Sequence, residues 1–453
     1  MEGLTAHRIA AAFERAGMPA ADVPDRTGLV TSAWDEFVRA TGHAPAWAWW
    51  IPGRIEVFGK HTDYAGGRSL VAAVPRGFAF VAAPRLDRVL TAHDARWQAA
   101  MQMAPADEAA VFTGWNNYVA VVARRLARNF PGAELGADIA FASDLPRAAG
   151  VSSSSALVVG MASALIRRAG LEHRPEWGAN ITSRLDLAGY LGAVENGLTF
   201  RGLAGTSGVG TRGGTEDHTA ILNCRADAVS AFSYIPVCHV GDASLPAAWR
   251  FVVMSSGVEA AKAGAARGRY NRASLATQAL VAVWRAHAGG DPATLASALA
   301  TGDVADRRAA LTAAIDAHPH PDFTPDELRR RLAHFIAEDA RVPIALDAFA
   351  RADRDVLRDL AAATQDDAER LLQNQVPQTS ALVRLALEEG AFAASSFGAG
   401  FGGSVWALVE ARHAAGFVDR LRRRYLDRFT GLESVAAFVA RPAPAATEIS
   451  LTE

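Results

Sequence analysis

The segment Asp144–Ser155, with the sequence DLPRAAGVSSSS, contains a glycine and four consecutive serines, and an apolar stretch at 156–169 follows it. The apolar stretch predicts a helix, so the serines would stand at its N-terminus, where backbone N–H groups lack partners within the helix. Such groups, at the positive end of the helix dipole, bind anions. Serine is also a common N-cap, but four serines exceed the needs of one cap. From these residues alone, a phosphate site and a serine-rich cap remain alternatives.

A second polar segment, Pro52–Gly67 (PGRIEVFGKHTDYAGG), lies at the end of a predicted strand, Trp47–Phe58. Its loop, Gly59–Gly67, places basic, acidic, hydroxyl and imidazole groups close together. These groups offer both hydrogen-bond donors and acceptors. The segment is therefore a candidate site for a ligand rich in hydroxyl groups, such as a sugar, and a solvated polar turn is the alternative.

A third segment, Gly398–Gly403 (GAGFGG), matches the pattern GxGxxG. A dinucleotide fingerprint of this kind opens a helix. Here the following residues, SVWALVE at 404–410, alternate as in a strand, which argues against NAD. A glycine loop between two strands allows close backbone approach to a ligand, and a purely structural hairpin is the alternative.

A fourth segment, at 202–218, is a glycine-rich loop that ends in Thr215-Glu-Asp-His218. Asp217 is a candidate general base, since a carboxylate takes a proton in many enzymes. A single aspartate in a loop is more often a turn or cap residue, so this role needs support from the other segments.

The length of 453 residues favours two domains. Predicted strands and helices do not alternate regularly, which favours an α+β fold. We expect residues 1–45 to be helical with breaks at Pro19 and Pro24, and we expect a break in the first strand at Pro52–Gly53. Residues 269–373 are predicted to be almost wholly helical, and the tail after Arg441 to be frayed. The predicted domains are 1–240, which would bind nucleotide and sugar, and 241–453.

The composition excludes several classes of function. The net charge is −2, so the chain has no overall basic field for nucleic acid or an anionic membrane. No stretch has the length and apolarity of a signal peptide or a membrane span. The two cysteines, Cys224 and Cys238, fit a reducing cytoplasm better than a disulfide framework. The composition does not indicate an oligomeric state.

Taken together, the four segments resemble the motifs of the GHMP kinase family, and most of all those of its galactokinases. The segment Pro52–Gly67 is similar to the galactokinase pattern PGRVNLIGEHTDYNGG, and the order and spacing of the other segments fit. The resemblance covers roughly residues 25–435. It implies an S5-like N-terminal domain, a ferredoxin-like C-terminal domain, here with a helical insertion, and an active site between them. It also implies ATP-dependent phosphorylation of a monosaccharide, at the anomeric hydroxyl of galactose or a related sugar.

The resemblance assigns roles to individual residues. It implies that Asp217 and Arg54 are catalytic and that Mg²⁺ is held by Ser154 and Glu195. Trp115, in the segment WNNY, would lie near the adenine of ATP. The implied phosphate-binding residues are Gly150, Ser152, Ser153, Ser154 and Ser155, and the implied substrate-binding residues are Lys60, His61, Asp63, Gly214 and Tyr270.

Lys60 departs from the galactokinase pattern, which has glutamate there. Lysine occurs at only two positions, Lys60 and Lys262, in a chain rich in arginine. One interpretation is that Lys60 meets an anionic or acceptor-rich sugar, such as a uronic acid or an amino sugar; arabinose is a further candidate acceptor. In the other, which we favour, Lys60 pairs with Asp63, Glu56 or Glu216 and the sugar remains galactose-like.

A second departure is Glu216, which places another carboxylate beside Asp217, where the two charges could raise one pKa. Glu216 could instead point away. A different class of function is a non-catalytic sensor of ATP and sugar. The presence of Ser154, Glu195 and Asp217 together argues against a sensor and for an enzyme.

Overall fold

Two long antiparallel strands, β1 (Trp47–Phe58) and β2 (Arg68–Pro84), form the centre of the first sheet. In the computed structural model, which describes residues 3–146, 149–259, 264–300, 302–432 and 435–451, the side chains of β1 alternate between two apolar clusters. Trp49 and Ile51 join one cluster and Ala48 and Trp50 the other, as the two-residue period of a strand requires. The sheet therefore has a hydrophobic core on each face.

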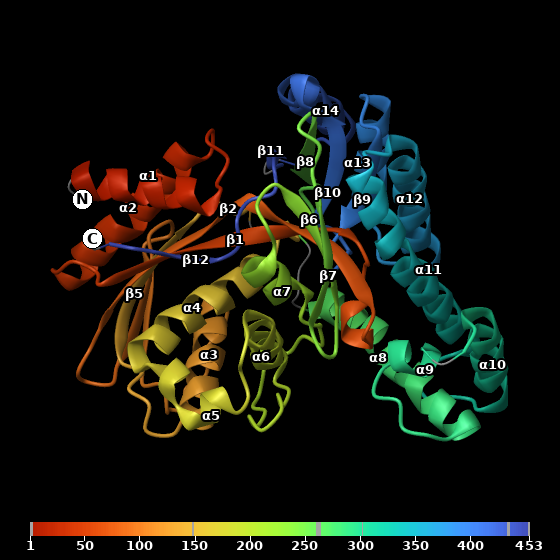
Figure 1. Cartoon of the computed structure of the whole chain (residues 1–453), viewed down its shortest axis with the longest axis horizontal. Coiled ribbons are helices and arrows are strands. Elements are labelled where there is room, and N and C mark those ends of the chain that lie inside the picture. The colour runs from red at the N-terminus through yellow and green to blue at the C-terminus, as the bar shows by residue number, and fades with distance from the viewer. Residues whose placement is uncertain (1–2, 147–148, 260–263, 301, 433–434, 452–453) are drawn as a thin grey trace.

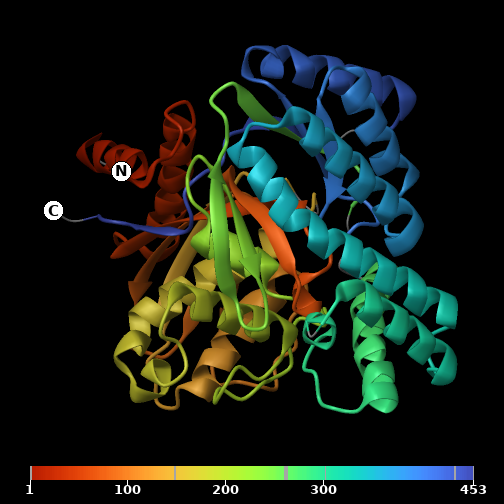
Figure 2. The same cartoon turned by 45° about the vertical axis from the view of Figure 1, so that its right-hand side comes forward.

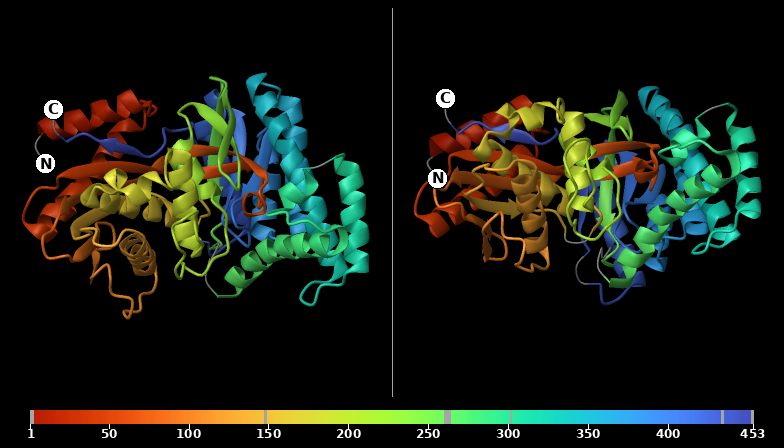
Figure 3. Two further views of the ribbon diagram at one scale, coloured as in Figure 1. Left: turned by 60° about the horizontal axis from the view of Figure 1, so that its bottom comes forward. Right: turned by 90° about the horizontal axis from the view of Figure 1, so that it is seen from below.

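The described part of this sheet has eight strands, in the order β12-β1-β2-β5-β3-β4, with the hairpin β6–β7 paired to β2. The remaining strands are β3 (Leu90–Asp94), β4 (Ala99–Met103), β5 (Ala137–Ser143), β6 (Ala228–Ser233), β7 (Cys238–Ser244) and β12 (Thr447–Ile449). The expected frayed tail is wrong, because Ile449 of β12 pairs with Ala48 of β1. The first and last described segments of the chain lie at the same end of the molecule (Figure 3).

The predicted break of β1 at Pro52–Gly53 is also wrong, because the strand continues through it with a shift of register between Pro52 and Arg54. Gly53 packs closely here: a Cβ at this position would lie 2.8 Å from both the Val151 carbonyl oxygen and a methyl group of Leu145. The N–H of Arg54 donates to the same carbonyl at 3.3 Å. This irregularity joins β1 to the serine-rich turn.

Helices cover both faces of the first sheet (Figure 1). On one face lie α1 (Gly3–Ala16) and α2 (Val23–Thr41). The predicted break at Pro19 is confirmed, whereas Pro24 lies in the first turn of α2, where proline is tolerated. On the other face lie α3 (Trp115–Asn129), α4 (Ser153–Ala169), α5 (Pro175–Gly178), α6 (Arg184–Asn196) and α7 (Glu216–Asn223).

The second sheet is antiparallel, with the strand order β11-β8-β10-β9. Its strands are β8 (Trp249–Ser255), β9 (Ala393–Phe397), β10 (Ser404–Glu410) and β11 (Ala437–Ala440). Alternate residues of β8 face different apolar clusters: Val252 and Met254 pack with residues of α13 (Pro377–Glu388) and α14 (Ala414–Arg428), whereas Phe251 and Val253 belong to the cluster shared with the first sheet. That shared cluster joins the two sheets.

The predicted helical region at 269–373 is confirmed in its described part. It contains α8 (Gly264–Ala288), α9 (Leu295–Leu299), α10 (Val304–Ala317), α11 (Pro325–Ala350), α12 (Arg354–Asp367) and a π-helical turn, Ala368–Leu372. Residues of α8, α9, α10 and α11 share an apolar cluster of their own. Figure 2 shows the long helix α11 running from beside the β6–β7 hairpin to the helices α8 and α10.

The α+β prediction is confirmed by these mainly antiparallel sheets with separately grouped helices. The domain division after residue 240 stays a prediction. The chain passes from the first sheet to the second between Ser244 and Trp249, and β12 returns to the first sheet at the end of the chain.

Candidate active site

A cavity of about 500 Å³ brings the four predicted segments together. Its lining comes from the loop after β1, the turn before α4, the start of α7 and the loop between β9 and β10. The volume suits a small-molecule site, because such pockets commonly enclose roughly 300–1,000 Å³. One end is lined by aromatic side chains and the other by charged and polar groups, so the cavity is divided chemically.

The serine-rich turn forms the middle of the cavity. Gly150 and all four serines, Ser152, Ser153, Ser154 and Ser155, line it. The turn reverses through positive φ values at Gly150 (73°) and Ser152 (62°) before α4 begins at Ser153. The N–H groups of the first turn of α4 thus point toward the cavity side of the helix end, as an anion site requires. The neighbouring residues 147–148 lie outside the described part of the chain.

The glycine loop at 398–403 supports this turn. It connects β9 to β10, so the expectation of a strand–loop–strand hairpin is confirmed. The hydroxyl of Ser404 donates to the carbonyl oxygen of Ala149. A Cβ at Gly398 would lie 3.2 Å from the Gly150 carbonyl oxygen, so a larger residue would push the two loops apart. Gly398 and Ala399 also line the cavity.

Arg54 and Asp217 meet beside the turn. Both Nε and Nη2 of Arg54 contact Oδ1 of Asp217, at 2.9 and 2.6 Å, and Nη1 donates to the Gly150 carbonyl at 2.6 Å. The sequence placed Asp217 in a loop, but it lies in the first turn of helix α7. One arginine therefore connects the candidate base to the candidate phosphate turn.

Ser155 brings a second carboxylate to the same point. Its hydroxyl lies 2.9 Å from Oε2 of Glu195 and 3.2 Å from Oδ2 of Asp217, and it can donate to one of them at a time. Nε2 of His218 lies 3.0 Å from Oε2 of Glu195. A hydroxyl and two carboxylates are hard oxygen donors of the type that Mg²⁺ prefers. Ser154 lines the cavity too, and its role as a metal ligand stays a prediction.

The polar end of the cavity contains His61, Asp63, Gly214 and Tyr270, as predicted. Oδ2 of Asp63 accepts a hydrogen bond of 3.1 Å from the N–H of Glu216. Only glycine fits at position 214, because a Cβ there would lie 2.1 Å from the same oxygen. The ring of Tyr270 meets that of His61 edge to face. These contacts join the loop after β1 to the glycine-rich loop before α7.

His61 is neutral in this setting. Burial, followed by the charge of Arg331, lowers the pKa of its imidazole to about 3. Its Nδ1 lies 2.9 Å from the hydroxyl of Tyr64, and Nδ2 of Asn374 lies 3.5 Å from its Nε2. A neutral imidazole provides one donor and one acceptor, which suits a hydroxyl group better than an anion.

Two further carboxyl groups, Glu56 and Glu216, also line the polar end and are buried. Burial raises the pKa of both carboxyl groups, and for Glu216 the rise is large, with the neighbouring Glu56 adding to the effect of burial. The N–H of Gly398 donates to Oε2 of Glu56 at 2.8 Å. Glu216 lines the cavity, so the alternative from the sequence, in which its side chain points away, does not hold.

Lys60 is absent from the lining of the cavity within the described residues. Its Nζ donates at 2.6 Å to the hydroxyl of Ser395 on strand β9. Among the carboxylates, Glu338 raises the pKa of this ammonium most. Neither interpretation of Lys60 from the sequence foresaw these partners. The backbone turns at Gly59, where a Cβ would clash with the Arg68 carbonyl at 2.3 Å, and the side chain is directed away from the cavity. Lys262 lies outside the described residues.

The other end of the cavity is aromatic. Trp115, at the start of α3, packs edge to face on Phe141 of β5, and Tyr118 lies one turn further along α3. Trp97, in the turn between β3 and β4, also lines this end and is half exposed. Such rings suit the flat base of a nucleotide. The position of Trp115 is consistent with its predicted place near adenine, which stays a prediction.

The sequence left several cavity residues unassigned. Glu56 was considered only as a partner for Lys60, and Tyr64, Trp97 and His218 were not singled out. The contacts from α11 were missed entirely. One signal was available: Arg331, His334, Glu338 and Arg341 recur at spacings of three and four within an apolar helical stretch, which predicts a polar stripe on one buried face.

Comparisons with known proteins agree with this geometry. Three family models match: the galactokinase galactose-binding signature at residues 35–84, the GHMP kinase N-terminal domain at 117–196 and the GHMP kinase C-terminal domain at 345–427. The galactokinase of Chloroflexus aurantiacus is 28% identical over 415 residues, covering 88% of this chain and 93% of the relative. That of Streptomyces coelicolor is 28% identical over 433 residues, covering 92% and 97%.

A solved structure shares the fold. Lactococcus lactis galactokinase complexed with galactose superimposes with a TM-score of 0.73 at 19% identity, covering 92% of this chain and 99% of that one. The sequence matches models of the GHMP kinase family in both its N-terminal and its C-terminal part. Within that family it is similar to the galactokinases.

Proposed function

We propose that this protein transfers the γ-phosphoryl group of ATP to the anomeric hydroxyl of galactose or a closely related sugar. The observation that carries the proposal is the position of Arg54, which contacts Asp217 and the Gly150 carbonyl at once. A sugar hydroxyl held near Asp217 would lie next to phosphates bound at the serine-rich turn. The chain's similarity to galactokinases supports this choice of acceptor.

Positioning and neutralisation of charge dominate phosphoryl transfer. Asp217 would orient the acceptor hydroxyl and take its proton as the bond to phosphorus forms. Oδ1 of Asp217 is held by Arg54, and Oδ2, which the Ser155 hydroxyl approaches at 3.2 Å, would accept the proton. Arg54 would fix the carboxylate and offset negative charge that develops on the phosphoryl group. His61, Asp63, Gly214 and Tyr270 would hold the sugar.

The residues present fit a Mg²⁺ ion. Ser155 and Glu195 would hold it, with Ser154 as the serine that the family resemblance favours. When bound, Mg²⁺ neutralises charge on the β- and γ-phosphates. It needs few protein ligands because it keeps several waters, which agrees with so small a donor set. The aromatic end, with Trp115, would bind the adenine.

The charges at the polar end favour a neutral acceptor. Glu56, Asp63, Glu216 and Asp217 line it with one arginine, Arg54, and the ammonium of Lys60 points elsewhere. A uronic acid would add another carboxylate to this group and would be repelled. Galactose or arabinose, whose hydroxyls donate hydrogen bonds to carboxylates, suits the site better.

The test is ADP release measured with purified protein, ATP and Mg²⁺ across galactose, arabinose, galactosamine and galacturonic acid. We expect turnover with galactose or a close relative and none with the uronic acid. Binding of ATP and sugar without turnover of any acceptor would instead support a sensor and overturn the kinase proposal. Phosphorus NMR of the product would identify the phosphorylated hydroxyl.

Two features bear on the setting of the reaction. No described helix is long and apolar enough to span a membrane. Cys224 is buried, Cys238 is exposed, and both are free thiols. The free thiols support our proposal of a reducing cytoplasm.

A further inference from the structure

One face of helix α11 fixes the backbone of the loop that carries His61 and Asp63. Near the start of that face, Arg331 donates to the His61 carbonyl oxygen and, at 3.1 Å, to the Tyr64 hydroxyl. Seven residues further on, Oε1 of Glu338 accepts hydrogen bonds from the N–H groups of Gly59 and Lys60, at 3.0 and 3.2 Å. Residues seven apart lie two turns apart on the same side of a helix. The helix therefore holds the loop at two points.

A third contact closes the loop. Oδ1 of Asp339 accepts a hydrogen bond of 2.7 Å from the N–H of Arg68, where the loop enters β2, and an ion pair joins the two side chains. Within the loop, the Thr62 hydroxyl bridges the Gly59 and Arg68 carbonyl oxygens. The position of His61 and Asp63 in the cavity thus depends on a helix that follows in sequence by more than two hundred residues.

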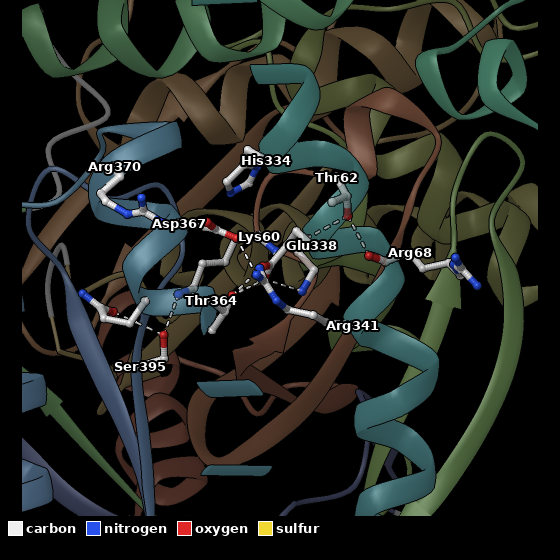
Figure 4. A network of polar contacts seen from close by, with 12 residues as sticks. Lys60, Thr62, Arg68, His334, Glu338, Arg341, Thr364, Asp367, Arg370 and Ser395 are labelled. Atoms are coloured by element: carbon white, nitrogen blue, oxygen red, sulfur yellow. Dashed lines mark hydrogen bonds and ion pairs between the residues drawn. The ribbon is translucent and has the colours of Figure 1, made fainter. Parts of the chain in front are cut away.

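Glu338 is a fully buried carboxylate, with 0% of its surface exposed. Such a group needs both hydrogen bonds and countercharge, since desolvation of an unpaired charge is costly. Its hydrogen bonds come from the two loop N–H groups and from the Thr364 hydroxyl. Its countercharge comes from Arg341, whose Nη1 lies 2.7 Å from Oε2. The buried ammonium of Lys60 lies in the same cluster but forms no direct ion pair with Glu338 (Figure 4). Burial alone would raise the pKa of Glu338, and these two cations hold it below its ordinary value.

Lys60 is the other half of this arrangement. Its side chain is 1% exposed and its Nζ donates to Ser395, whose hydroxyl lies 3.3 Å from Oε1 of Gln365. Lys60, Glu338, Arg341, Thr364 and Ser395 lie together in Figure 4, with Ser395 on the second sheet and Glu338 on α11. A compact ammonium suits this enclosed position better than a planar guanidinium, which is a reason for one lysine in an arginine-rich chain.

We propose that Lys60 and Glu338 form a positioning pair, in which the buried ammonium stabilises the carboxylate and the carboxylate holds the sugar-binding loop in place. The pair rests on the proposed function, because it acts through His61 and Asp63 as sugar-binding residues. Lys60 does not touch the sugar. This chain has lysine where the galactokinase pattern has glutamate, and the lysine acts on how the loop is held. The protein groups that contact the hydroxyls of the sugar are therefore unchanged.

The test is a double-mutant cycle in the full-length protein with Lys60→Met, Glu338→Gln and the double variant. Lys60→Met leaves a buried carboxylate with one cation fewer, so we expect the sugar KM to rise about tenfold and the ATP KM to change by less than about twofold. In the double variant both charges are absent. We expect it to bind sugar at least about fivefold better than independent effects would predict.

The second measurement is hydrogen exchange of the peptide that covers residues 54–68, which needs neither substrate nor turnover. We expect faster exchange at the Gly59 and Lys60 amides in Glu338→Gln, because the neutral amide is a weaker acceptor than the carboxylate. Ser395→Ala is a milder variant that removes the acceptor of the ammonium together with the contact of this hydroxyl to Gln365. It provides the same comparison should Lys60→Met fail to fold.

The matched control is Arg358→Met, which removes a cation from exposed pairs with Asp355 and Asp359 on α12. It should leave both KM values and the exchange of residues 54–68 unchanged. Two results would overturn the pair: independent effects of the two substitutions with unchanged exchange, or a Lys60→Met effect limited to sugars with one particular substituent. A wild-type protein that phosphorylates no sugar would refute the proposed function instead, and the exchange measurement would still decide the role of the pair.

Discussion

Arg54 and Asp217 lie 163 residues apart in sequence and form a contact in which two nitrogens of the guanidinium reach one carboxylate oxygen, at 2.6 and 2.9 Å. The third nitrogen of the guanidinium donates to the Gly150 carbonyl. The carboxylate is thus fixed relative to the turn that would bind phosphate. A fixed orientation of this kind is what general-base catalysis and near-attack positioning require.

The first prediction concerns Asp217. Asp217→Asn keeps the shape of the side chain but removes its ability to take a proton, so kcat should fall at least about a thousandfold. ATP affinity, measured by calorimetry, should change by less than about threefold, since the adenine and phosphate sites are intact. Asp227→Asn, which alters an exposed aspartate paired with Arg441, is the control and should be fully active. An active Asp217→Asn enzyme would exclude Asp217 as the base.

The second prediction separates Ser155 from Ser154. The Ser155 hydroxyl lies between Glu195 and Asp217, so Ser155→Ala should raise the Mg²⁺ concentration needed for half-maximal activity about tenfold. Ser154→Ala is the matched comparison on the same turn. If Ser154→Ala changes the Mg²⁺ dependence and Ser155→Ala does not, the serine implied by the family pattern is the ligand and the contact of Ser155 is structural.

The sequence predicted the site better than its surroundings. The four serines and Asp217 stand in short motifs whose residue types indicate their chemistry, and the family resemblance pointed to Arg54 and Asp63; all of these residues line the cavity. The helix at α4 was likewise predictable from its apolar stretch, and its start differs by three residues because the serines themselves belong to the first turn. Local signals of this kind are contained within a single segment.

The wrong predictions concern features that depend on residues far apart in the sequence. The direction of the Lys60 side chain depends on Glu338 and Ser395, which are 278 and 335 residues away along the chain. The pairing of β12 with β1 likewise depends on an edge strand at the other end of the sequence. No local pattern contains these partners. The polar stripe on α11 indicated that a polar partner must exist, but not which segment would provide it.

The third prediction is an alkaline loss of sugar affinity that depends on Lys60. Burial lowers the pKa of the Lys60 ammonium from its ordinary value of 10.5 to about 8, against the attraction of Glu338 and Glu56; Arg341 lowers it further and Glu369 raises it. As the pH rises through about 8, the folded protein loses this cation and Glu338 loses a partner. The ratio kcat/KM for sugar should therefore fall above pH 8. In Lys60→Met this dependence should be absent and the ratio low throughout.

The same group has a separate effect on stability. Between pH 8 and 10.5 the unfolded chain keeps the Lys60 proton that the folded protein has lost, so this group makes the free energy of unfolding rise with pH. Stability and sugar affinity should thus move in opposite directions over this range. If the two decline together above pH 8, general unfolding rather than Lys60 would explain the loss.

The fourth prediction concerns the buried carboxyl group of Glu216. Burial and the neighbouring Glu56 raise the pKa of Glu216 well above 4.5, so the folded protein keeps a proton that the unfolded chain has lost. The unfolded state binds fewer protons in this range, and the contribution of Glu216 to stability therefore falls as the pH rises from about 4.5 through the folded pKa.

Glu216→Gln stays neutral at every pH. It should raise the free energy of unfolding at pH 8, and this gain should shrink toward pH 4.5, where the unfolded chain takes up the proton as well. Urea unfolding between pH 4.5 and 8.5 measures the difference, with the exposed residue Glu172 changed to Gln as the control. A gain that does not vary with pH would show that Glu216→Gln improves packing and would contradict a raised pKa of Glu216.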